Sequence, residues 1–410
     1  MALVVRLANA GAAGAGVSAV GGKGASLGEL ARAGVAVPPG FVVTVEAFAA
    51  AMAAIDPSGA HRASVEALDA ADLAGIAGVA ARLRALVTEA PLPAEVAAAI
   101  SSGYADLGAD AGARAGAEAG AGADVAVRSS ATVEDSAEAS FAGLQDTYLG
   151  VSGAAAVLGY VRRCWASLYN DESVAYRRRL GLPEAGVAMA VVVQRMVAPR
   201  AAGVMFTRSP VTGDRSVVAI EGTWGLGSAL VSGDVTPDAW VISKITGDIT
   251  SRRVSPKVKI HIPIQNGSLT PPSPPSAAPG EAAQPVAEAG GQAAAPSELG
   301  WVAVRDNPAE LRDAPCLTDD EIRALAAVAR RVEAHYGAPQ DIEWAVLDAP
   351  FAQASGGAGA SGGSAASAES RVVLLQSRPE TVWAAREMTP AGAPKARAAD
   401  HVLALFGKPL

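Results

Sequence analysis

The chain of 410 residues is 50% hydrophobic but only 4% aromatic, which allows a large buried core distributed over two or three domains or lobes. Its formal net charge of −8 argues against a nucleic-acid partner, because such a surface needs a cluster of basic residues. With two widely separated cysteines, no membrane-length apolar run and no recognisable signal peptide, we expect a cytoplasmic protein without disulfides, a zinc site or membrane contact.

The first patterned segment is the glycine-rich stretch GGKGASLGEL, residues 21–30. A short helix is predicted after Lys23, because Leu27 and Leu30 recur at helical spacing and Gly34 is placed to end it. Glycines let the backbone approach an anion, and a helix start offers free N–H groups, so the segment suits a phosphate. It is not a Walker loop, and a solvated lysine in a tight turn is an equally open alternative.

A strand is predicted over residues 124–130 (DVAVRSS), with Arg128 near its end and several Ser and Thr residues after it. A guanidinium beside small hydroxyl residues suits phosphate oxygens, which accept its paired N–H groups. The alternative, slightly favoured by the local sequence, is an ion pair between Arg128 and Glu134, Asp135 or Glu138.

The remaining ordered segments alternate between strand-like and helix-like patterns. Strands are predicted over 187–197, 216–222, 341–348 and 371–379, with a turn into a strand over 37–44. The clearest helix spans residues 318–336, where Thr318 and Glu321 form a capping box and Gly337 follows the end. The alternation indicates an α/β or α+β architecture.

Three stretches of low complexity are expected not to pack. Residues 108–124 are rich in Ala and Gly and predict a loop or a frayed helix. Residues 265–298, rich in Pro, Ser and Ala, predict a disordered insertion, and residues 352–370 predict a flexible Gly/Ser loop.

The last two predicted strands carry the most informative pattern. A period of two places Glu343 on one face of the first strand and Leu374, Gln376 and Arg378 on one face of the second. If the strands pair as a hairpin, Glu343, Gln376 and Arg378 share a face. A carboxylate and an amide oxygen suit Mg²⁺, and Arg378 would hold a phosphate beside the metal. The alternative is a strand pair with a polar solvent face and no ligand.

Several motifs occur in order along the chain: GGKGASLGEL…GVAVPPGFVVT, VAVRSSATVEDSAEASFAG, VVVQRMV…AGVMFTRSPVTGD, WGLGSALVSGDVTPD, DIEWAV and LLQSRPETVW. Over about residues 15–385 they resemble the nucleotide-binding part of the phosphoenolpyruvate synthase and pyruvate phosphate dikinase family. The resemblance implies an α+β, two-lobed ATP-grasp fold with low-complexity inserted loops. Residues 1–193 would form the first lobe, 194–385 the second lobe, and 386–410 a C-terminal tail.

The resemblance also implies roles for individual residues around ATP. Lys23 and Arg128 would hold the ATP phosphates, and the SFAG segment ending at Gly143 would cover them with backbone N–H groups. Gln194 would line the adenine side of the cleft.

On the metal side, the resemblance implies that Glu343 and Gln376 ligate Mg²⁺ and that Arg378 contacts the transferring phosphates. These are the residues that the hairpin pattern places on one face. Lys23, Arg128 and Arg378 are therefore the predicted catalytic residues.

Two departures from the family's pattern bear on function. The family commonly has an acidic residue after WGLG, where this chain has Ser228, and none of the four histidines lies in the family's phosphate-accepting histidine motif. We therefore expect a dikinase-type phosphotransferase component that binds Mg-ATP and passes pyrophosphate or phosphate to a histidine on a separate polypeptide. The alternatives are a non-catalytic protein that senses ATP or AMP, and a stand-alone kinase resembling rifampicin phosphotransferase.

Overall fold

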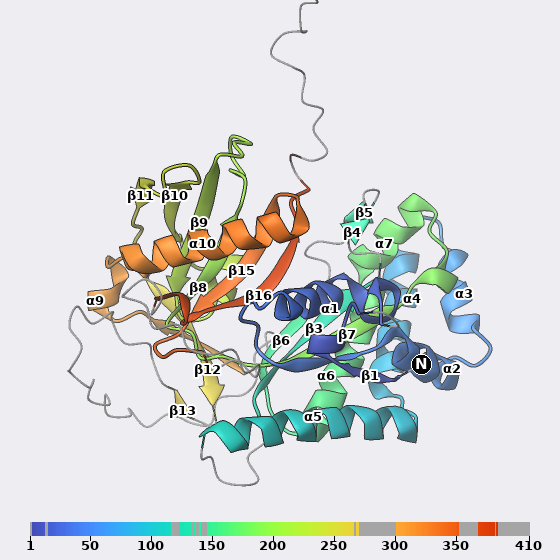
Figure 1. The fold of residues 1–410 in the computed structure, drawn as a ribbon. Coiled ribbons are helices and arrows are strands. Elements are labelled where there is room, and N and C mark those ends of the chain that lie inside the picture. The colour runs from blue at the N-terminus through green and yellow to red at the C-terminus, as the bar shows by residue number, and fades with distance from the viewer. Residues whose placement is uncertain are drawn as a thin grey trace, which may run out of the picture.

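The computed structural model describes residues 2–12, 15–115, 123–132, 135–136, 139–140, 146–265, 268–269, 301–351, 368–381 and 383. Helices cover antiparallel sheets, which confirms the expected α+β class (Figure 1). Across these ranges, no helix combines the length and apolar character needed to cross a membrane.

The first sheet is buried on both faces. Its strand order is β1 (Val4–Arg6), β2 (Gly40–Val43), β7 (Met189–Arg195), β3 (Val125–Ala131) and β6 (Thr147–Val151). Successive residues of β7 point into two different cores: Val192 lies in one and Val193 in the other. Because both faces of the strand are buried, its sequence is a continuous apolar run. One face packs on helices α2 (Val45–Ile55), α3 (Ala60–Glu66), α4 (Leu73–Glu89), α5 (Ala94–Ala115), α6 (Ala154–Ala166) and α7 (Asp171–Leu180).

The second sheet has the order β11 (Ile249–Arg253), β10 (Asp238–Ser243), β9 (Val217–Trp224), β8 (Ala201–Phe206), β15 (Gln340–Val346) and β16 (Val372–Pro379). Helix α10 (Asp319–Tyr336) lies across one face (Figure 1) and buries Ile322 and Leu325 in the same core as Trp344. The smaller elements are β4 (Asp135–Ser136), β5 (Ala139–Ser140), β12 (Lys259–Gln265), β13 (Ser268–Leu269), β14 (Val302–Asp306), α8 (Ser228–Val231) and α9 (Ala309–Arg312).

Helix α1 (Val17–Arg32) lies between the two sheets (Figure 1). Its Leu27 and Leu30 pack in the same core as Val192 of the first sheet and Leu374 of the second. The hydroxyl of Ser26 donates to the carbonyl of Ser377 at 2.7 Å. This helix therefore fixes strand β16 relative to the first sheet.

Most predicted elements are present, with two differences in extent. The predicted helix after Lys23 begins earlier, at Val17, and contains a kink at Gly21. The Ala/Gly-rich stretch from 108 is helical as far as Ala115, because alanine is the strongest helix former. Helix α10 has the predicted capping box, and Gly337 follows it in the left-handed conformation.

Parts of the low-complexity stretches lie outside the described residues. Residues 116–122, most of the predicted insertion at 265–298 and residues 352–367 of the predicted Gly/Ser loop belong to this group. Of the insertion, Gln265 ends β12 and Ser268–Leu269 form β13.

The predicted hairpin of β15 and β16 is confirmed, with a bulge inside it. Glu343 pairs with Gln376, as the period of two predicts, but the register then shifts and Trp344 pairs with Leu374. Leu375 is the extra residue, and a bulge of this kind reverses which face the preceding residues occupy. The prediction that Leu374 shares a face with Gln376 is therefore wrong, and Leu374 packs with Trp344 in the core.

Candidate functional site

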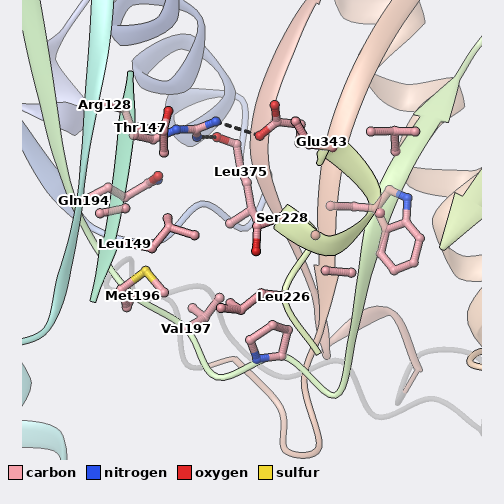
Figure 2. Close-up of a pocket in the computed structure, with 18 of the residues that line it drawn as sticks. Arg128, Thr147, Leu149, Gln194, Met196, Val197, Leu226, Ser228, Glu343 and Leu375 are labelled. Carbon is pink, nitrogen blue, oxygen red and sulfur yellow. Dashed lines mark hydrogen bonds and ion pairs between the residues drawn. The ribbon is translucent and has the colours of Figure 1, made fainter. Parts of the chain in front are cut away.

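A cavity of about 270 Å³ opens between the two sheets (Figure 2). Its walls come from strands β3, β6 and β7 of the first sheet, from β8, β15 and β16 of the second, and from the segments 195–199 and 226–232. Figure 2 shows Arg128 and Glu343 together at one end, and Met196, Val197 and Leu226 at the other. The cavity thus has a charged end and an apolar end.

Arg128 joins the two sheets at the charged end. Its Nη2 donates to Glu343 Oε2 at 2.6 Å and to Gln376 Oε1 at 3.0 Å, while Nη1 donates to the carbonyl of Leu375 at 2.6 Å. Arg128 is only 7% exposed, and its carboxylate partner lies 215 residues away in the sequence. The described acidic partner of Arg128 is therefore Glu343 of the second sheet. Of the neighbouring acids considered as alternatives, Glu134 and Glu138 lie outside the described residues.

Lys23 is held beside the arginine by the glycine turn that precedes it. Gly21 has a φ of 69°, and a Cβ there would lie 2.1 Å from the carbonyl oxygen of Ser130, so only glycine allows this approach. The hydroxyl of Ser130 accepts from the N–H of Gly24 at 3.1 Å. Lys23 Nζ then donates to the carbonyl of Ser129 at 2.8 Å, one residue along β3 from Arg128.

Arg378 lies two residues beyond Gln376 on β16 and pairs with Asp341 of β15. Its Nε and Nη2 donate to Asp341 Oδ2 at 2.9 and 2.7 Å. Burial raises the pKa of Asp341, although the guanidinium of Arg378 opposes this shift. Lys23, Gln376 and Arg378 are not among the residues that line the cavity, but Gln376 contacts Arg128 at its charged end.

Gln194 lines the cavity from strand β7. Its side chain is almost fully buried, and its amide Nε2 donates to the carbonyl of Pro38 at 3.0 Å. Leu149 and Met196 are its neighbours on the same wall (Figure 2). Gly143, the other residue predicted to bind the nucleotide, lies outside the described residues.

One group of polar residues at the cavity was not expected from the sequence. Ser228 Oγ lies 3.0 Å from His261 Nδ1, and His261 Nε2 lies 3.1 Å from Asp234 Oδ2. His261 was placed in no motif, because 33 residues separate it from Ser228 and no spacing rule connects them. Ser228 itself lines the cavity.

The cavity thus combines an apolar end with a charged end where Arg128 pairs with Glu343. A family model described as pyruvate phosphate dikinase, AMP/ATP-binding domain, matches residues 17–398. The chain belongs to this family.

Individual relatives agree with this assignment. The chain is 42% identical over 340 residues to a rifampicin phosphotransferase of a Streptomyces species, covering 82% of this chain and 34% of that protein. It is 37% identical over 385 residues to a probable phosphoenolpyruvate synthase of Staphylothermus marinus, covering 90% of this chain and 40% of that protein. It is 37% identical over 374 residues to a phosphoenolpyruvate synthase of Aeropyrum pernix, covering 90% of this chain and 41% of that protein. The chain therefore spans 34 to 41% of the length of these relatives.

Proposed function

We propose that the chain is the ATP-binding component of a phosphoenolpyruvate synthase-like phosphotransferase, built as an ATP-grasp fold. Residues 1–193 would form one lobe, 194–385 the other, and 386–410 a tail. The observation that supports this best is the cluster of Arg128, Glu343 and Gln376 at the charged end of an apolar cavity. The adenine would occupy the apolar end near Gln194, and the phosphates would extend toward Arg128.

The basic side chains at the charged end would bind the phosphates. Arg128 offers a planar set of N–H donors. Lys23 of α1 adds a point charge nearby, because its Nζ contacts the carbonyl of Ser129, the residue after Arg128. Arg378 would contact the outer phosphates, and backbone N–H groups of the segment ending at Gly143 would cover them. All three cations now contact oxygens of the protein, so phosphate oxygens would replace ligands of the same chemical kind.

Glu343 and Gln376 fit a magnesium ion. Glu343 Oε2 and Gln376 Oε1 converge on a single nitrogen of Arg128, at 2.6 and 3.0 Å. Two oxygens that share one cationic partner can share a metal ion, and a carboxylate with an amide oxygen is a hard donor set of the kind Mg²⁺ prefers. When bound, the ion would neutralise charge on the phosphates.

In this proposal the chain holds ATP while a histidine on a separate polypeptide attacks it. The imidazole nitrogen would form the new bond to the β-phosphorus, AMP would leave with the electron pair of the broken P–O bond, and the histidine would carry the pyrophosphoryl group. Arg128 and Lys23 would stabilise the charge that develops on the phosphate oxygens. Relatives named rifampicin phosphotransferase and phosphoenolpyruvate synthase support a phosphotransferase function.

The test uses ATP labelled at the β-phosphate, the purified chain, magnesium and an extract of the source organism. Acid-labile label on a second polypeptide supports the proposal and identifies that polypeptide by its mass. Lys23→Ala and Glu343→Ala should each remove this transfer and keep the circular dichroism spectrum of the wild type. Binding of ATP without any transfer would instead favour a non-catalytic sensor of ATP or AMP.

A second candidate is a stand-alone kinase, favoured by the 42% identity to a rifampicin phosphotransferase. It predicts that the chain alone, given ATP, magnesium and rifampicin, forms a phosphorylated antibiotic. Mass spectrometry of the antibiotic decides this, since transfer in trans leaves its mass unchanged.

A further inference from the structure

Ser228, His261 and Asp234 form a chain of hydrogen bonds behind one wall of the cavity. The distances are 3.0 Å from Ser228 Oγ to His261 Nδ1 and 3.1 Å from His261 Nε2 to Asp234 Oδ2. His261 is 1% exposed, whereas the Asp234 side chain is 47% exposed. Only Ser228 of the three lines the cavity.

The backbone of His261 also fixes the loop that carries Ser228. The N–H of Leu226 donates to the carbonyl of His261 at 2.9 Å. Gly225 has a φ of 71°, and a Cβ there would lie 2.4 Å from the same carbonyl oxygen, so the loop lies directly against β12. His261 thus positions both the backbone and the hydroxyl of this wall.

The charges determine the direction of each hydrogen bond. A hydrogen bond from Ser232 lowers the pKa of Asp234, and burial lowers the pKa of His261, so at neutral pH the carboxylate is ionised and the imidazole is neutral. An ionised carboxylate only accepts, so Nε2 carries the imidazole hydrogen and Nδ1 accepts the hydrogen of Ser228. The Ser228 oxygen therefore faces the cavity as an acceptor.

We propose that Ser228, oriented by His261 and Asp234, accepts a hydrogen bond from the nucleoside part of the bound nucleotide. This rests on the proposed ATP site. Figure 2 places Ser228 between Glu343 at the charged end and Leu226 at the apolar end. Ionised phosphate oxygens carry no hydrogen to donate, so the partner is a sugar hydroxyl or the exocyclic amino group of the base.

Binding of nucleotide analogues to the full chain tests this inference by calorimetry. The probes are ATP, its 2′-deoxy and 3′-deoxy forms, and a purine ribonucleoside triphosphate without the 6-amino group. Ser228→Ala should weaken ATP binding about 3- to 10-fold, the range of one neutral hydrogen bond. An analogue that lacks the group donating to Ser228 should bind the wild type more weakly than ATP does, by a similar factor. The same analogue should bind Ser228→Ala as tightly as ATP binds that variant.

The analogue that shows this pattern identifies the donor as sugar or base. Val231→Ala is the control, because it removes cavity wall from the same short helix without a polar group, and it should discriminate among analogues as the wild type does. If every analogue shows the same affinity ratio between wild type and Ser228→Ala, the inference is wrong. If the wild type binds no adenine nucleotide at all, the proposed function fails with it.

Asp234→Ala tests the orienting role separately. Without the carboxylate, no acceptor from position 234 holds the imidazole hydrogen on Nε2, so the hydrogen can move to Nδ1 and the Ser228 hydroxyl hydrogen can turn toward the cavity. The preference of the protein for nucleotides that carry the donor group should then fall toward the preference seen in Ser228→Ala, while the thermal transition stays close to that of the wild type. Retained discrimination in Asp234→Ala would show that Ser228 acts without the relay and would overturn that part of the inference.

Discussion

Replacing Arg128 by methionine should change two affinities in opposite directions. In the structure the guanidinium occupies the point on which Glu343 Oε2 and Gln376 Oε1 converge, at 2.6 and 3.0 Å. Arg128 is therefore both a proposed ligand of the ATP phosphates and a competitor of the divalent cation. Methionine keeps much of the side-chain length and removes the charge.

The size of each change in affinity follows from the contact that Arg128→Met removes. Loss of a charge-assisted hydrogen bond to phosphate costs about 1.5–3 kcal/mol, so ATP should bind about 10- to 150-fold more weakly. The ion pair with Glu343 is partly screened, since the carboxylate side chain is 34% exposed. A metal ion that binds Glu343 must first break this ion pair, at a cost of about 1 kcal/mol. Arg128→Met removes that cost, so Mn²⁺ without nucleotide should bind about fivefold more tightly.

Electron paramagnetic resonance of free Mn²⁺ measures the second affinity, and calorimetry with ATP measures the first. Arg128→Lys is the matched control, because it keeps the charge and loses the planar set of donors. It should weaken ATP binding without the gain in Mn²⁺ affinity. A fall of both affinities in Arg128→Met would refute the competition, since it would show that Arg128 supports the metal ligands.

Three further predictions concern stability. Gly21→Ala should lower the free energy of unfolding by more than about 3 kcal/mol, because the new Cβ collides with the backbone of Ser130 and the positive φ is strained for alanine. Gly34 also has a positive φ but open space around it, so Gly34→Ala should lower the same free energy by only about 1 kcal/mol. Urea denaturation measures both values. Lys257→Met should destabilise by about 3–5 kcal/mol, because it leaves Asp238 fully buried without its cation; a midpoint shift no larger than that of Gly34→Ala would contradict this. Burial lowers the pKa of His261 below 6.5, so unfolding binds a proton there and stability should fall as the pH drops below 6.5; His261→Gln should flatten that part of the profile.

The sequence alone determined the local structure. The α10 helix has the start and end that Thr318, Glu321 and Gly337 predict, because a capping box and a left-handed glycine act within one turn of the chain. The β15–β16 pairing followed from alternation, which placed Glu343 opposite Gln376 correctly. Ordered motifs likewise predicted the family to which the chain belongs.

Tertiary structure alone decided which side chains meet. The bulge at Leu375 accompanies the burial of Leu374 in the core, and a period of two contains no signal for an inserted residue. The local sequence offered Arg128 nearby acids, but the meeting of the two sheets gave it Glu343, 215 residues away. His261 had no motif, and it contacts Ser228 of the cavity wall only because β12 lies against the loop carrying Ser228. Local patterns follow from backbone geometry and capping, whereas these contacts depend on how separate elements pack.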